Sequence, residues 1–211
     1  MDLSPKYIRD DITKMGSLVE SILHKCLDEK ISLDEILTIE EQIDDFHMQI
    51  DDRVFKYIAL KKPAAKDLRE ALSIMKINTD LERMADQAVV IKRYWDECET
   101  RHKEINLMNN EVCLMVKNCL DCFVEHNQPL ARQTIEDDQQ INQMNRDLAK
   151  KFIDMMKHDK LDFDEGFALV RVVKNLERIA DLATNIAEDV VFLESGADIR
   201  HRASKTRGKI L

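Results

Sequence analysis

The sequence LERMAD at residues 81–86 recurs as LERIAD at residues 176–181, with five of six positions identical. The two copies lie 95 residues apart in a chain of 211, which indicates an internal duplication. Each copy presents two acids and an arginine within a stretch whose apolar residues recur at helical spacing. The repeated hexapeptide therefore predicts two similar helical units in one chain.

The composition favours a helical protein and argues against several other classes. The chain has 4 Gly and 3 Pro, too few for a turn-rich β fold. Its hydrophobic content of 44% is too high for a disordered chain, and no apolar run approaches the roughly 20 residues that span a bilayer. The first residues, MDLSPKYIRDD, are charged where a signal peptide would be apolar, so we expect a cytoplasmic protein. The net charge of −9 argues against a nucleic-acid partner.

Helix start and stop signals divide the apolar pattern into six segments. The signals are Pro5, a capping box from Ser32 to Glu35, Pro63, the charged stretch near Arg101, Asn127 to Pro129, and a second box from Asp162 to Glu165. They predict helices at 5–28, 33–61, 63–99, 102–126, 129–157 and 163–195, with the third running almost directly into the fourth. Short connections make successive helices antiparallel neighbours.

We therefore predict an all-α protein of two tandem three-helix bundles related by internal duplication. The first bundle is expected at residues 1–100 and the second at residues 101–195, followed by a basic C-terminal tail at residues 196–211. The tail contains five Lys or Arg and one Asp, and we interpret it as a solvated chain end.

Paired acids on adjacent helices form the candidate site of each bundle. Residues four apart share one side of a helix, and each bundle has such pairs on its second and third helices. The candidate residues are Glu40, Asp44, Glu82 and Asp86 in the first bundle, and Asp138, Asn142, Glu177 and Asp181 in the second. His47, Asp51 and Glu188 extend these polar rows and are weaker candidates.

The turn positions predict which acids face each other. Antiparallel helices pair residues that lie equally far from their turn. Glu40 and Asp86 are equally far from Pro63, and so are Asp44 and Glu82. The acids of the second bundle are arranged in the same way around residues 159–160. We therefore expect the acids of each bundle to meet at one height.

Adjacent carboxylates repel unless they are protonated, paired with a base, or bridged by a cation. One interpretation is that Arg83 and Arg178, with nearby lysines, neutralise these acids. Another is a metal site, because oxygen donors suit iron, manganese, magnesium or calcium, and the spacing selects no single metal. A separate CxxC pair, Cys119 and Cys122, has no second pair with which to hold zinc, so we interpret the cysteines as reduced core residues.

These motifs resemble the PhoU family of bacterial regulators of phosphate uptake. The resemblance covers nearly the whole chain and also includes PAAKDLR at residues 63–69 and LATNIAEDVVFLESGADIRHR at residues 182–202. It implies a non-catalytic adaptor that restrains phosphate uptake and the phosphate-starvation response. The implied partners are the ATPase subunit of a phosphate ABC importer and a membrane sensor histidine kinase, with membrane contact only through these partners. The family also implies a homodimer, and iron or zinc clusters at the acidic motifs of some members.

Two substitutions depart from the family pattern. Asn142 stands where an acid is usual, which removes one anionic ligand from the second site. Arg93 stands where Glu188 maps onto the first bundle. We therefore expect the two sites to differ in metal number or occupancy.

Two other functions fit parts of the sequence. A ferritin-like di-iron enzyme would use similar acids but needs Glu-x-x-His on each of two helices, and only Glu99 and His102 match, at a helix junction. A metal-free helical scaffold would need only solvated acids. The chain has no HExxH motif, nucleophile elbow or Gly-rich phosphate loop, so we expect no catalytic activity.

Overall fold

A computed structural model describes residues 5–195 of the chain as six helices without a strand. The helices are α1 (Pro5–Lys25), α2 (Leu33–Lys61), α3 (Ala65–Asp96), α4 (Lys103–Glu125), α5 (Gln128–Lys157) and α6 (Phe163–Ser195). The predicted all-α class is therefore confirmed, and the basic tail at residues 196–211 lies outside the described residues. No helix in the described part is both long and apolar enough to cross a membrane.

Side-chain caps start the helices where the sequence signals predict. At α2 the Ser32 Oγ atom accepts a hydrogen bond from the Glu35 amide at 3.2 Å, and the Glu35 carboxylate accepts one from the Ser32 amide at 3.3 Å. At α5 the Asn127 side chain accepts from the Leu130 amide at 3.0 Å. These bonds satisfy amides that have no partner within the helix, so both helix starts are encoded locally.

Tertiary contacts explain the boundaries that differ from the prediction. Helix α1 ends three residues early because α3 binds the following loop: the Trp95 indole donates to the Leu27 carbonyl at 2.9 Å, and the Lys92 ammonium donates to the Asp28 carbonyl at 3.1 Å. The expectation that α3 runs almost directly into α4 is wrong. Residues 97–102 separate the two helices, and the Arg101 guanidinium lies 4.7 Å from the centroid of the Trp95 ring.

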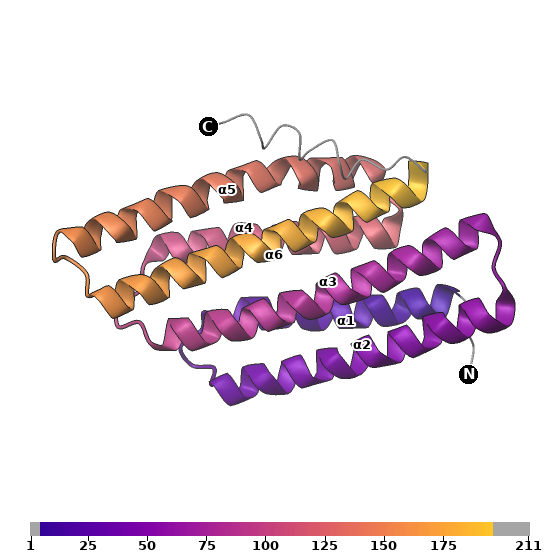
Figure 1. Cartoon of the computed structure of the whole chain (residues 1–211), viewed down its shortest axis with the longest axis horizontal. Helices are drawn as coiled ribbons and strands as arrows, with labels where there is room; N and C mark the ends of the chain where they lie inside the picture. Colours follow the sequence, from indigo (N-terminus) through magenta and orange to yellow (C-terminus); the bar gives the residue numbers. More distant parts are fainter. Residues whose placement is uncertain (1–4, 196–211) are drawn as a thin grey trace.

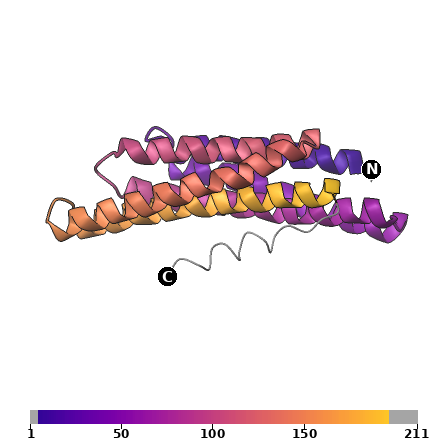
Figure 2. The same cartoon turned by 90° about the horizontal axis from the view of Figure 1, so that it is seen from above.

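The six helices form two layers. Figure 1 shows α2, α3, α6 and α5 side by side in that order, with α1 and α4 behind them, and Figure 2 shows the same two layers from above. Helices α1–α3 form one bundle and α4–α6 the other. The bundles meet through contacts of α3 with α6 and of α1 with α4. Because α3 and α6 run in opposite directions, the α2–α3 turn and the α5–α6 turn lie at opposite ends of the molecule.

One continuous hydrophobic core joins the two bundles. The apolar positions of both hexapeptides belong to it: Leu81 and Met84 in α3, and Leu176 and Ile179 in α6, have no exposed surface. The acids of the hexapeptides lie beside this buried row, at the border of core and solvent. The duplication therefore places two equivalent helices, each with the same apolar face, where the bundles meet.

Candidate functional site

The structure brings the acids of α2 and α3 together. Burial raises the pKa of Glu40, and the charges of Asp44 and then Asp86 raise it further. Burial and then Asp86 raise the pKa of Glu82, to which Asp44 also contributes, and burial followed by Asp44 raises the pKa of Asp86. Carboxylates on opposite helices therefore repel each other, as the turn geometry predicts. We call these four residues the first acid cluster.

Among the residues that the structure describes, the first acid cluster has no salt bridge that would balance this repulsion. The Arg83 guanidinium lies 3.9 Å from the Asp80 carboxylate, and its charge lowers the pKa of Glu82 and Asp86 only from a greater distance. Within residues 5–195, no Lys, Arg or His side chain lies within 4.0 Å of a carboxylate of the cluster. The geometry therefore favours a proton or a bound cation over an arginine network at this place.

His47 and Asp51 continue the acid row along α2. The His47 Nε2 atom lies 3.8 Å from the Asp51 carboxylate, and the buried Nδ1 atom of His47 has no hydrogen-bond partner among the described residues. The Asn78 amide of α3 donates to the His47 carbonyl and to the Asp51 carboxylate, each at 3.0 Å. Asn78 thus fixes this part of α2 against α3. The Nδ1 atom of His47 could serve as a metal ligand.

Two of the corresponding acids of α5 and α6 have a partner on their own helix. The Asn142 amide donates to the Asp138 carboxylate at 2.6 Å, and Asp138 is 3% exposed. The Lys174 ammonium lies 2.5 Å from the Glu177 carboxylate, one turn away on α6. Asp181 is half-buried and Glu188 is buried on the same helix. The two acid clusters therefore differ, with the stronger uncompensated negative charge on α2 and α3.

The first acid cluster fits a cation in its donor chemistry but is not assembled around one point. Carboxylate oxygens with one imidazole nitrogen suit hard and borderline metal ions. In residues 5–195, however, no group of three or more His, Cys, Asp or Glu side chains lies close enough to hold one ion. Binding a cation here would require side chains to rotate toward each other, and metal binding remains a prediction.

Sequence reasoning missed two buried acids at the interface between α3 and α6. Asp80 is 9% exposed and Asp189 is 3% exposed, and both line a hollow of about 450 Å³ together with Asp51. Burial and then the charge of Asp189 raise the pKa of Asp80 to about 6. The repeat could not reveal them, because the equivalent positions in the other bundle are Asn175 and Tyr94. Only their position beside the candidate acids could have suggested them.

Two alternative ligand patterns do not form suitable sites. Glu99 and His102 lie in the linker between α3 and α4, outside any helix, and the His102 ring packs 4.9 Å from the ring centroid of Phe152. Cys119 and Cys122 are buried free thiols, and burial raises the pKa of Cys122 to about 12. A protonated, buried thiol is a poor metal ligand, so the cysteines belong to the core.

A family model described as the PhoU domain matches residues 12–94 and again residues 105–190. The chain belongs to the PhoU family. One match lies in the bundle of α1–α3 and the other in the bundle of α4–α6, which confirms two tandem PhoU units related by duplication.

Relatives resemble this PhoU-family chain over most of its length. It is 31% identical to the phosphate-specific transport system accessory protein PhoU homolog of Clostridium acetobutylicum, across 91% of this chain and 93% of the relative. It is 30% identical to the protein of the same name from Pseudomonas putida, across 94% of this chain and 82% of the relative.

Two crystal structures share the fold. The phosphate transport system regulatory protein PhoU from Streptococcus pneumoniae matches with a TM-score of 0.86 and 28% identity, covering 94% of this chain and 98% of that one. The structure of PhoU from Pseudomonas aeruginosa matches with a TM-score of 0.87 and 27% identity, covering 91% and 97%. The PhoU fold therefore extends over both bundles and the contact between them.

Proposed function

We propose that this chain is a non-catalytic regulator of phosphate uptake. In this role it acts as an adaptor between the ATPase subunit of a phosphate ABC importer and a phosphate-sensing histidine kinase, and restrains the phosphate-starvation response. The observation that carries the proposal is the match of both bundles to relatives named as accessory or regulatory proteins of phosphate transport. The protein would work in the cytoplasm as a homodimer and reach the membrane only through its partners.

The proposal includes a cation at the first acid cluster, held by Glu40, Asp44, Glu82 and Asp86, with His47 as a further donor. Iron, manganese and zinc are candidates by the chemistry of these ligands. The support is the mutual repulsion of these carboxylates, for which residues 5–195 supply no compensating salt bridge. A bound cation would supply the missing positive charge and link α2 to α3. Because an adaptor needs states that bind its partners differently, such a link is a means of regulation.

A pull-down with purified components tests the adaptor role. The untagged chain is passed over immobilised ATPase subunit of the phosphate importer, with and without inorganic phosphate, beside the ATPase of an unrelated importer as control. We expect retention by the phosphate importer subunit alone, with an amount that changes with phosphate. Absence of binding under both conditions would contradict the adaptor role.

Elemental analysis tests the cation independently of any partner. The parent protein is compared with the variant Glu82→Gln/Asp86→Asn and with the matched variant Glu177→Gln/Asp181→Asn of the second bundle. We expect stoichiometric metal in the parent, its loss from the first variant, and a smaller change in the second. If all three fold and none contains metal, the acids serve a metal-free helical scaffold.

A further inference from the structure

The α2–α3 turn and the α5–α6 turn hold equivalent places in the two bundles but carry opposite charge. Residues 61–69 contain four Lys or Arg and one Asp, a net charge of +3. Residues 159–165 contain four Asp or Glu and one Lys, a net charge of −3. Since the turns lie at opposite ends of the molecule (Figure 1), the four-helix layer has a basic turn at one end and an acidic turn at the other.

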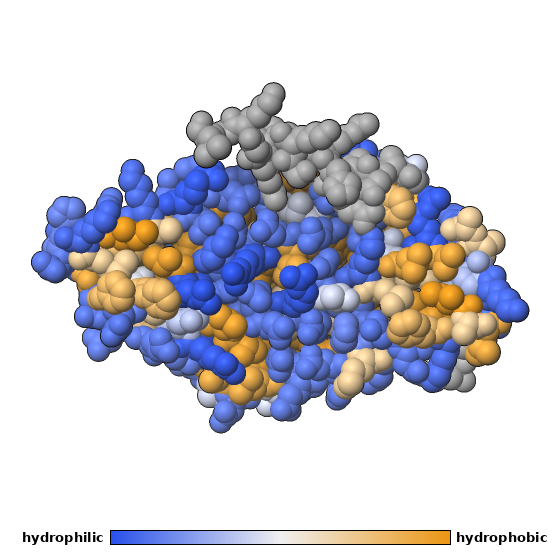
Figure 3. All heavy atoms as spheres, in the orientation of Figure 1, coloured by the Kyte–Doolittle hydropathy of each residue, from blue (hydrophilic) through white to orange (hydrophobic). Residues whose placement is uncertain are grey.

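Exposed apolar side chains lie beside both turns. Near the basic turn Phe55 is 60% exposed and Leu72 is 47% exposed, and near the acidic turn Phe163 is 69% and Phe167 is 50% exposed. Leu72 and Phe167 are equivalent positions, 95 residues apart, so both repeats expose an apolar residue at this point of their third helix. Figure 3 shows hydrophobic surface toward both ends of this face and mainly hydrophilic surface across its middle.

We name these surfaces by their residues. The basic patch consists of residues 61–69 with Phe55 and Leu72. The acidic patch consists of residues 159–165 with Glu97 and Phe167. Contiguous apolar surface with a polar, charged border is typical of protein interaction sites.

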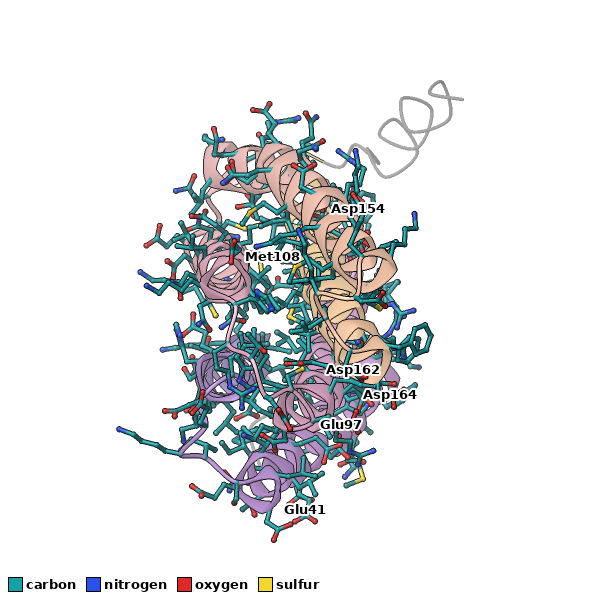
Figure 4. The ribbon with its side chains drawn as sticks, turned by 90° about the vertical axis from the view of Figure 1, so that its left-hand side faces the viewer. Glu41, Glu97, Met108, Asp154, Asp162 and Asp164 are labelled. Atoms are coloured by element: carbon teal, nitrogen blue, oxygen red, sulfur yellow. The ribbon has the colours of Figure 1, made fainter. Side chains whose placement is uncertain are left out.

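Two charged side chains of each patch are available to a partner. In Figure 4, Asp162 and Asp164 at the start of α6 lie beside Glu97 at the end of α3. Asp162 caps α6, accepting a hydrogen bond from the Asp164 amide at 2.9 Å. The side chains of Glu97 and Asp164, and of Lys61 and Lys66 in the basic patch, form no ion pair within the described part of the chain.

We propose that two copies of this chain pair antiparallel through the layer of α2, α3, α6 and α5, so that the basic patch of each copy contacts the acidic patch of the other. A two-fold axis across the long direction of this face forms both contacts at once and closes the assembly at two copies. Each contact joins apolar side chains surrounded by opposite charges, which fixes the relative orientation of the copies. The inference rests on the homodimer proposed above and assigns its surface, leaving the layer of α1 and α4 outside the contact.

Sedimentation equilibrium of the full chain measures the dimer dissociation constant. The variant Lys61→Glu/Lys66→Glu changes the basic patch from +3 to −1, and the variant Glu97→Lys/Asp164→Lys changes the acidic patch from −4 to neutral. Each removes the attraction in both contacts, so each should raise this constant about tenfold or more. Mixing the two variants in equal amounts should restore part of the association, because one contact of the mixed dimer joins the unchanged acidic patch of one variant to the unchanged basic patch of the other. Misfolded variants would not show this recovery, and far-UV circular dichroism confirms their helicity.

An apolar pair of variants provides a matched control. Phe167→Ser should weaken the dimer, whereas Leu114→Ser, which removes a 51% exposed leucine from α4 in the other layer, should not. A dimer that ignores the charge reversals, a dimer weakened by Leu114→Ser alone, or a mass that grows beyond two copies would overturn the assigned surface. A monomer at all concentrations would overturn the homodimer as well. The pull-down and the elemental analysis would still decide the adaptor role and the cation separately.

Discussion

Replacing Asp80 with Asn should stabilise the metal-free protein at neutral pH. Folding buries Asp80 at the interface between α3 and α6, where it is 9% exposed and near Asp189. Burial and then the Asp189 charge raise the pKa of Asp80 from 3.8 to about 6, against opposing effects of Arg83 and Lys76. The amide has nearly the same shape as the carboxylate but no charge. The substitution therefore removes an electrostatic cost without leaving a cavity.

The size of the effect follows from the linkage of protonation and folding. A carboxyl with a pKa of 3.8 in the unfolded chain and about 6 in the folded one binds its proton more tightly when folded. The Asp80 contribution to stability therefore falls as the pH rises from about 4 to about 6, and is level above that range. A shift of one pKa unit corresponds to about 1.4 kcal/mol, so the ionisation of Asp80 costs up to about 3 kcal/mol near pH 7.5. Because a buried amide retains part of the desolvation cost, we expect Asp80→Asn to gain about 2 kcal/mol.

Urea unfolding followed by far-UV circular dichroism in the presence of EDTA measures this gain. The parent and the variant are compared near pH 7.5 and near pH 4.5, where less than half of the gain should remain. The exposed Asp45 of α2 supplies the control Asp45→Asn, for which we expect a change within about 0.5 kcal/mol at both pH values. A loss of stability in Asp80→Asn near pH 7.5, or an equal gain at both pH values, would refute the reasoning.

Three further substitutions test other parts of the structure. Asn142→Asp replaces the donor of the 2.6 Å hydrogen bond to Asp138 with a second carboxylate. Without metal, this change should lower the free energy of unfolding by about 1 kcal/mol. In differential scanning fluorimetry, added Mn²⁺ should stabilise this variant more than the parent. Lys92 is 1% exposed, and its ammonium lies 2.7 Å from the Asp96 carboxylate. Lys92→Met removes this charge, and urea unfolding should show a loss of about 2 kcal/mol in stability. The loss is below the usual cost for a fully buried ion pair because Asp96 is itself exposed. Cys122→Ala should leave the metal content by elemental analysis unchanged, and a lost metal ion would show that the thiol is a ligand.

The sequence was sufficient to predict the helices because the signals that start and end them are local. The Ser32 and Glu35 side chains cap α2 within one turn, and the residues of α2 need no distant contact to begin the helix there. The apolar spacing likewise specifies which side of each helix is buried, as for Leu81 and Leu176. The predicted helix boundaries are wrong where a distant side chain binds the backbone, as the Trp95 indole does when it donates to the Leu27 carbonyl after the end of α1.

The acids of the first cluster could also be placed from the sequence. One turn and the antiparallel rule locate Glu40 opposite Asp86, because a short connection leaves two long helices no other register. The same rule places Asp138 opposite Asp181 and Asn142 opposite Glu177, but it does not show that Asn142 donates to the Asp138 carboxylate or that Lys174 pairs with Glu177. Whether an acid keeps its charge uncompensated depends on side-chain rotamers, which helical spacing leaves open.

What the sequence determined by itself is the repeat, the six helices and the face that each buries, since these follow from neighbours within a few positions or from one turn. Only the tertiary structure decided that α3 of one bundle lies against α6 of the other. That contact buries Asp80 near Asp189 and places turns of opposite charge at opposite ends of one layer. The physical reason is that packing between the bundles depends on the shapes of two whole surfaces, whose residues are far apart in the chain and share no periodic pattern.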